Sequence, residues 1–262
     1  MIAPRHLLAL RSWIPPVLLL TLMAGGWELW VRLRETPAWY LPAPSRVFRT
    51  MWEERSSLLE NSRVTLEEVV IGLSVAIVAG SAMAVAIHLS SLVERTAWPL
   101  VIASQAIPVV ALAPLLLIWF GHGLTPKVIM TALIAFFPVT VATADGLRSA
   151  DRETLALLRT MGASRWQRFV LVEAPGALPA FFSGLKVAVS VAVIGAVIGE
   201  FVGSDSGLGH AIILANASLR TDLVFASVVV LSLMAIALFA LVVVIERLAL
   251  PWRRYQIEAG KR

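Results

Sequence analysis

The chain has 262 residues, of which 58% are hydrophobic and 15% charged, and its formal net charge is +5. This share of apolar residues exceeds what a water-soluble domain of this size needs for its core, so the composition indicates an integral membrane protein. The Lys and Arg residues lie mainly in short segments between apolar runs, as topology signals do, which argues against a nucleic-acid partner. The absence of cysteine excludes disulfides, thiolate metal sites and cysteine nucleophiles.

Six apolar runs are long enough to cross a hydrocarbon core of about 30 Å, which takes about 20 helical residues. Because lipid offers no partner to backbone N–H and C=O groups, each run is expected to be a helix. The sequence therefore predicts an all-α, polytopic membrane helix bundle that forms a single domain. The six predicted transmembrane helices are 13–31, 67–89, 98–120, 126–146, 179–201 and 222–246.

The first run leaves two interpretations open. It follows Arg5 and Arg11, its apolar centre is short, and Ala24-Gly25-Gly26 resembles a cleavage site, which is the pattern of a secretory signal. The same residues also suit a retained first transmembrane helix. Either outcome leaves residue 32 outside, so the topology of the remaining chain is the same.

The distribution of Lys and Arg predicts the orientation of the bundle. With the N-terminus inside, the segments assigned to the cytoplasm carry more Lys and Arg than the segments assigned to the outside. We therefore expect a multi-pass protein with both termini in the cytoplasm. The periplasmic segments are then about 32–63 and 203–221, and a long cytoplasmic loop covers about 147–178.

The cytoplasmic loop contains two apolar faces at helical spacing, separated by a glycine. They consist of Leu155, Leu158 and Met161 before Gly162, and of Trp166, Phe169 and Val170 after it. A glycine can take the left-handed conformation that ends one helix, and Ala163 and Ser164 can start the next. The pattern predicts two short helices that meet at Gly162 and are surrounded by arginines. Such a hairpin could dock into a protein partner or lie on anionic lipid headgroups.

Two ionisable residues lie in the fifth predicted span, Lys186 inside it and Glu200 near its outer end. A charge at the bilayer centre costs about 2.5 to 3.5 kcal/mol, so each is expected to face protein or water. We expect Glu200 to line or gate the translocation pathway, the alternative being a cap on the bundle. For Lys186 we expect snorkelling toward the cytoplasm, the alternative being a place in the pathway.

Small and turn-forming residues mark the end of this span and the segment after it. Gly195, Gly199 and Gly203 recur every four residues, which predicts a close helix crossing. The segment 203–221 combines turn formers with a short apolar helix, as a periplasmic gate would. Asp205 could contact solute or binding protein there, but the expected role is that of a solvated turn residue.

The loop around Gly162 resembles the cytoplasmic docking motif of permease subunits of bacterial ABC importers. That motif reads Glu-Ala-Ala, three residues, Gly, nine residues, and then Ile-x-Leu-Pro. Here nine residues also separate Gly162 from Val172-Glu173-Ala174-Pro175, so the spacing is kept. The identities differ, because Ala156, Leu157 and Leu158 take the Glu-Ala-Ala positions and Ala174 replaces Leu. Glu153, one turn earlier, is the candidate to replace the missing glutamate.

The resemblance covers most of the chain and points to the branch that imports nitrate, sulfonates, taurine and pyrimidines. It is also carried by "LPAPSRVF" (41–48), "WFGHGLTPKV" (119–128), "FFPV" (136–139) with "DGL" (145–147), and "GEFVGSDSGLGHAI" (199–212). The stretch "TDLVFASVVVLSLM" (221–234) most resembles permeases for hydroxymethylpyrimidine, a thiamine precursor.

This resemblance implies the fold of type I (MetI-like) ABC importers and a bacterial inner-membrane permease homodimer. Its implied partners are two cytoplasmic ATPase subunits and a periplasmic or lipoprotein solute-binding protein. The chain has no G-x-x-x-x-G-K-[ST] loop, so ATP and Mg²⁺ are expected to act in the ATPase, and this chain is expected to bind no cofactor. The residues implied in docking the ATPase are Glu153, Leu158, Arg159, Met161, Gly162, Ala163, Arg165, Trp166, Arg168 and Pro175. Of these, Leu158, Met161 and Trp166 are the expected anchors.

Two other classes of protein fit the sequence less well. An ion-coupled secondary transporter would show more spans and an inverted repeat with paired broken helices, and no such repeat is seen. An intramembrane enzyme would need a catalytic set, yet the chain has no H-E-x-x-H, no G-x-S-x-G and no Asp pair at membrane depth. The histidines lack metal-ligand spacing, so we expect neither catalytic nor metal-binding residues.

Few residues in the sequence indicate which substrate is transported. Trp119, Phe120, Phe136 and Phe137 could stack a flat pyrimidine, although packing at the membrane interface explains such aromatic residues as well. We expect a pyrimidine thiamine precursor as the cargo, with sulfonate or taurine, nitrate and riboflavin as alternatives.

Overall fold

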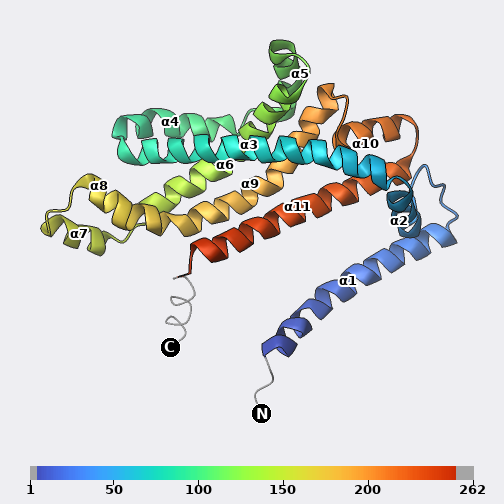
Figure 1. Ribbon diagram of the computed structural model, residues 1–262, viewed down its shortest axis with the longest axis horizontal. Coiled ribbons are helices and arrows are strands. Elements are labelled where there is room, and N and C mark those ends of the chain that lie inside the picture. Colours follow the sequence, from blue (N-terminus) through green and yellow to red (C-terminus); the bar gives the residue numbers. More distant parts are fainter. Residues whose placement is uncertain (1–4, 252–262) are drawn as a thin grey trace. The chain divides into compact units, whose positions relative to one another are not determined.

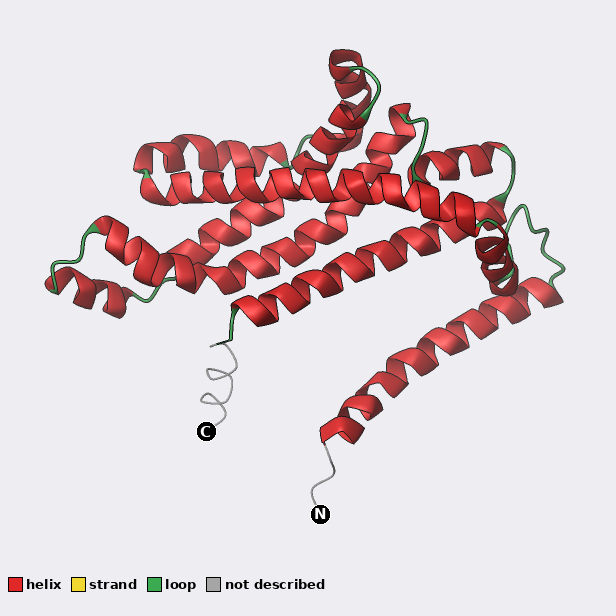
Figure 2. Ribbon diagram, viewed as in Figure 1, coloured by secondary structure: helices red, strands yellow, loops and turns green. Residues whose placement is uncertain are grey.

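The computed structural model describes residues 5–251, and every regular element in this range is a helix (Figure 2). The predicted all-α class is therefore confirmed. Side chains are described from Pro15 to Pro251. The basic residues at both ends that entered the topology prediction lie outside this range: Arg5, Arg11, Arg253, Arg254, Lys261 and Arg262.

The helices follow one another through short connections (Figure 1). In chain order they are α1 Arg5–Leu33, α2 Pro44–Glu53, α3 Arg55–Leu89, α4 Ser91–Ser104, α5 Val109–Phe120, α6 Leu124–Arg148, α7 Arg152–Thr160, α8 Arg165–Arg168, the π-helical turn η1 Phe169–Glu173, α9 Ala174–Gly203, α10 Leu208–Ala217 and α11 Thr221–Ala249. Five described stretches are long and apolar enough to cross a membrane, and there are six if the bent pair α4 and α5 counts as one span. The predicted number of spans agrees with this finding.

The prediction of one continuous helix over 98–120 is wrong. Helix α4 ends at Ser104, α5 begins at Val109, and the two are bent by 100° relative to each other. Pro108 is the physical reason, because proline has no backbone N–H and its ring keeps the preceding residue out of the helical region. Pro114 lies inside α5 without ending it.

The chain forms two compact units. One comprises the described residues up to Leu59 together with Ala211–Val230, and the other comprises Glu60–His210 together with the chain from Leu231 onward. In the first unit the hydroxyl of Thr50 donates to Asp222 at 3.1 Å, and Arg220 pairs with Glu54 at 2.8 Å. The Arg220–Glu54 pair joins the two segments that were predicted to lie outside the membrane, whereas Asp222 is the first residue of the sixth predicted span.

In the second unit α6 and α9 run side by side along most of their lengths (Figure 1). Glycines make this approach possible. A Cβ on Gly195 would lie 2.9 Å from the Cα of Thr131, and one on Gly199 would lie 3.1 Å from the Cα of Lys127. The close helix crossing predicted from the glycine spacing is therefore confirmed. Thr131 is itself fully buried at this crossing, so the two backbones leave little room for larger side chains.

Candidate functional site

The loop between α6 and α9 is a helical hairpin with a cap on each helix. Asp151 caps α7 by accepting from the backbone N–H groups of Glu153 and Thr154 at 3.3 and 3.0 Å and from the Thr154 hydroxyl. These hydrogen bonds lower the pKa of the Asp151 carboxyl, since they favour its charged form. Ser164 and Gln167 cap α8 reciprocally, with bonds of 3.2 and 2.7 Å.

The turn between the two helices occurs at the glycine, as predicted. Gly162 has a φ of 79°, which other residue types rarely adopt, and a Cβ there would meet no atom within 4 Å. The prediction of two short helices that meet at Gly162 is therefore confirmed. The caps and this glycine fix the hairpin by local chemistry, without a buried core of its own.

The hairpin exposes large apolar side chains. Leu157 is 60% exposed, Met161 72% and Trp166 64%. Leu158, one of the expected anchors, is half-buried, whereas Leu157 is exposed beside Met161. The reason is the helical period, which places residues 157 and 161 on one side of α7 and residues 155 and 158 on another. Met161 and Trp166 are thus open to a partner, and Leu157 joins them.

The other residues implied in docking differ in their surroundings. Glu153 and Arg159 are exposed, whereas Ala163 and Pro175 are half-buried. Arg165 donates to the backbone carbonyl of Leu89 at 2.6 Å, although it is itself exposed. Arg168 is half-buried and its Nε has no hydrogen-bond partner within the described chain. Of the three arginines expected around the anchors, Arg159 is therefore the most available.

A second contact, which was not predicted from the sequence, joins the hairpin to α3. His88, in the last turn of α3, lies 2.8 Å from the carboxylate of Glu173 in η1. Phe169, also in η1, is buried and stacks on Trp166 with ring centroids 5.4 Å apart. No pattern in the sequence predicts the π-helical turn that brings these side chains together. The only available signal was a histidine at the end of an apolar span.

The opposite end of α9 carries a buried ion pair. Helix α9 has 30 residues, about 45 Å of rise, so its last turn is far from the hairpin. There the ammonium of Lys127 lies 2.7 Å from the carboxylate of Glu68 and 2.5 Å from the hydroxyl of Ser204. The side chains of Lys127 and Glu68 are 8% and 0% exposed. Neither Lys127 nor Glu68 was among the predicted site residues.

Glu200 belongs to the same cluster. Its carboxylate accepts from the Thr65 hydroxyl at 2.6 Å and from the backbone N–H of Gly209. Thr65 in turn accepts from the N–H of Leu208 at 2.9 Å. Glu200 is 1% exposed, so it connects α9 to α3 and to the start of α10 from inside the protein. This is the geometry of a cap, and a role in the pathway stays a prediction.

Asp205 and Lys186 lie in different surroundings. Asp205 is exposed and lines a hollow of about 280 Å³ with Glu67 and Glu68. Lys186 pairs with Glu246 of α11 at 2.6 Å, and their side chains are 23% and 9% exposed. The ion pair satisfies Lys186 within the bundle, which the expectation of snorkelling had not included.

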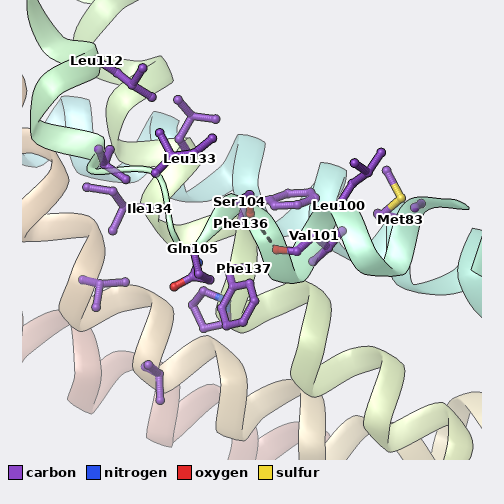
Figure 3. Close-up of a pocket in the computed structure, with 16 residues that line it drawn as sticks. Met83, Leu100, Val101, Ser104, Gln105, Leu112, Leu133, Ile134, Phe136 and Phe137 are labelled. Atoms are coloured by element: carbon purple, nitrogen blue, oxygen red, sulfur yellow. Dashed lines mark hydrogen bonds between the residues drawn. The ribbon is translucent and has the colours of Figure 1, made fainter.

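The second unit also contains a cavity of about 640 Å³ at the break between α4 and α5 (Figure 3). Gln105, at the end of α4, lines it together with Phe136 and Phe137 of α6. Of the four aromatic residues considered for substrate stacking, these two phenylalanines reach the cavity. The other two, Trp119 and Phe120, lie on the exposed surface of α5.

Residues 76–255 match the family described as "Binding-protein-dependent transport system inner membrane component". The chain belongs to this family. It is therefore a multi-pass permease subunit of an ABC importer in the inner membrane, a transport component of a binding-protein-dependent system.

Three relatives are similar over most of their length. A probable ABC transporter permease protein of Haemophilus influenzae is 39% identical, covering 86% of this chain and 92% of the relative. The formylaminopyrimidine transport permease protein ThiX of Halalkalibacterium halodurans is 39% identical, covering 93% and 97%. The riboflavin transport system permease protein RibX of Chloroflexus aurantiacus is 38% identical, covering 90% and 89%.

Solved structures show the same fold at low sequence identity. An amino acid ABC transporter chain matches with a TM-score of 0.64 at 17% identity, covering 76% of this chain and 97% of that one. The MetNI methionine ABC transporter in an inward-facing conformation matches with a TM-score of 0.59 at 20% identity, covering 77% and 98%. The expected type I, MetI-like fold is confirmed.

Proposed function

We propose that the α7–α8 hairpin is the surface on which a cytoplasmic ATPase subunit docks. The observation that carries this proposal is the exposure of Leu157, Met161 and Trp166 on a small, capped hairpin at the end of a membrane-length helix. Apolar anchors surrounded by charged side chains are typical of protein interfaces. ATP and Mg²⁺ act in the partner, and a second copy of this chain completes the permease.

The contacts around the hairpin support mechanical coupling to the bundle. Arg165 and Glu173 both contact the end of α3, and η1 continues directly into α9. At the other end of α9, Glu200 and Thr65 join it to α3 again. Because packed helices move as rigid bodies, a movement of the docked ATPase would displace α3 and α9 together. This displacement would switch the bundle between inward-open and outward-open states.

The proposed cargo is a pyrimidine thiamine precursor such as hydroxymethylpyrimidine, delivered by a periplasmic solute-binding protein. Support comes from the 39% identity to a formylaminopyrimidine permease over 93% of the chain. Riboflavin is the second candidate, because a riboflavin permease is nearly as similar. In both cases the molecule that crosses the membrane contains a flat nitrogen heterocycle.

The docking role can be tested at Gly162. We expect Gly162→Asp to abolish ATP-driven uptake and co-purification with the ATPase while the permease remains inserted, since the turn needs a positive φ. Gly176→Asp is the matched control, because Gly176 also has open space around it but lies inside α9 with ordinary helical φ. Wild-type uptake by Gly162→Asp in vesicles that hold the complete importer would refute the docking role. Uptake that is independent of ATP and is driven by an ion gradient would favour a secondary transporter.

A further inference from the structure

The break between α4 and α5 places non-helical backbone inside a membrane span. Residues 105–108 separate the two helices, and a cavity of about 640 Å³ opens beside them. Lipid cannot satisfy the free backbone groups at such a break, so breaks are tolerated where they lie within protein or line a cavity. In secondary transporters, discontinuous helices form the substrate sites, and the break beside this cavity is a comparable arrangement in a single span.

The Gln105 side chain is the main uncommitted polar group at this cavity. Ser104 donates its hydroxyl to the carbonyl of Val101 at 2.7 Å, within its own helix. Gln105 is exposed, and its carboxamide has no hydrogen-bond partner among the described residues. This carboxamide is therefore available to an occupant of the cavity that carries hydrogen-bonding groups of its own.

The remaining walls are apolar, and two of them are aromatic. Phe136 and Phe137 line the cavity from α6, together with aliphatic side chains such as Leu112 and Leu133 (Figure 3). Phenylalanine rings pack well against other flat rings. The described lining contains no Lys, Arg, His, Asp or Glu. An anionic solute would therefore enter without a counterion, which is strongly unfavourable.

We infer that this cavity is a binding subsite for an uncharged, planar nitrogen heterocycle, with the Gln105 carboxamide hydrogen-bonded to its ring edge and Phe136 and Phe137 packed on its faces. A carboxamide both donates and accepts, as does the edge of an aminopyrimidine, where a ring nitrogen adjoins an amino group. The volume lies within the range of small-molecule sites. The inference rests on the proposed import function and names the residues that would contact its cargo.

Cysteine protection tests occupancy directly, because the chain contains no native cysteine. In the importer reconstituted with its ATPase and binding protein, Ser104→Cys should react with a membrane-permeant maleimide. We expect hydroxymethylpyrimidine or riboflavin to slow this reaction during ATP-driven turnover, and taurine to leave it unchanged. Thr96→Cys is the matched control on α4, since Thr96 is exposed and does not line the cavity.

Uptake rates test the two kinds of contact. Gln105→Leu keeps the size of the side chain and removes its hydrogen bonds, so we expect uptake of the heterocycle to fall about tenfold. Phe137→Leu should also slow uptake, whereas Phe120→Leu on exposed α5 and Thr96→Val should not. Co-purification with the ATPase shows whether each variant assembles, and Gln105→Ala is the second variant if Gln105→Leu does not.

The outcomes separate this inference from the proposed function. If the wild-type complex imports a heterocycle with ATP, but Gln105→Leu and Phe137→Leu behave like wild type and Ser104→Cys is not protected, the subsite is wrong and the import function stands. If the wild-type complex imports only an anion such as taurine or nitrate, the subsite and the proposed cargo both fail. If ATP drives no uptake, the proposed function itself fails.

Discussion

Lys127, Glu68 and Glu200 show how single buried charges are satisfied in this bundle. Lys127 contacts Glu68 and Ser204, while Glu200 is held by Thr65 and by a backbone N–H. Charges removed from water are stable only when such partners are in place. The cluster therefore fixes the connection between α9 and α10 against α3 and α6.

Removing the lysine should leave a carboxylate buried and unpaired. We expect Lys127→Met to lower the free energy of unfolding by about 3 to 5 kcal/mol, measured by denaturant titration in detergent. Adding Glu68→Gln should recover part of this loss, since the double variant buries no charge at the pair. Arg49→Met is the control, because the Arg49–Glu53 pair is 79% and 56% exposed and such pairs contribute at most about 1 kcal/mol. Equal losses in Lys127→Met and Arg49→Met would contradict the argument.

At the scale of the helices, the crossing of α6 and α9 depends on residues that lack a side chain. Gly195 faces the backbone of α6, whereas Gly176 of the same helix faces open space. Replacement by alanine should therefore lower the stability of the bundle at Gly195 but not at Gly176.

We expect Gly195→Ala to destabilise the bundle, because the new Cβ would lie 2.9 Å from the Cα of Thr131. Overpacking of this kind costs about 1 to 3 kcal/mol, which outweighs a helix-propensity gain of at most about 1 kcal/mol. Gly176→Ala should be neutral or stabilising by up to about 1 kcal/mol. Thermal unfolding of both variants in detergent measures the difference. A higher Tm for Gly195→Ala than for the wild type would exclude a close crossing.

The contacts between the hairpin and α3 should matter for coupling more than for docking. In Glu173→Ala the carboxylate 2.8 Å from His88 is lost, while the exposed Met161 and Trp166 are unchanged. If the proposed docking is correct, this variant should still bind the ATPase but import less cargo per ATP hydrolysed. The ratio of uptake to phosphate release in proteoliposomes is the measurement, and Glu60→Ala is the control, because Glu60 is exposed and is not among the docking residues. An unchanged ratio would show that the His88–Glu173 contact does not contribute to the coupling between ATP hydrolysis and uptake.

At the scale of the whole chain, the proposed orientation assigns the hairpin to the cytoplasm and the turn after α9 to the outside. The two lie at opposite ends of a helix of about 45 Å, longer than the hydrocarbon core. The orientation is predicted from the distribution of Lys and Arg between the two sides.

Single cysteines in the natural cysteine-free background decide this orientation. An impermeant maleimide added to intact spheroplasts should label Asp205→Cys, since Asp205 is exposed in the turn after α9. Arg159→Cys on the exposed face of α7 should react only after the membrane is permeabilised. Labelling of Arg159→Cys in intact spheroplasts would show that the hairpin lies outside. The predicted orientation and the docking of a cytoplasmic ATPase on the hairpin would then both be wrong.

The sequence by itself determined the all-α class, the spans and the hairpin of this protein, but not the break between α4 and α5 or the π-helical turn η1. Hydropathy requires six spans because a helix must satisfy its own backbone in lipid, and the glycine and cap residues specify the hairpin because their preferences are local. Only the tertiary structure decided which distant residues meet. Lys127 with Glu68, Lys186 with Glu246 and His88 with Glu173 pair across different helices, and helical periodicity carries no information about the partner helix. The cavity at Gln105 likewise arises from the angle at a proline break, which depends on how α4 and α5 pack rather than on the residues of the break alone.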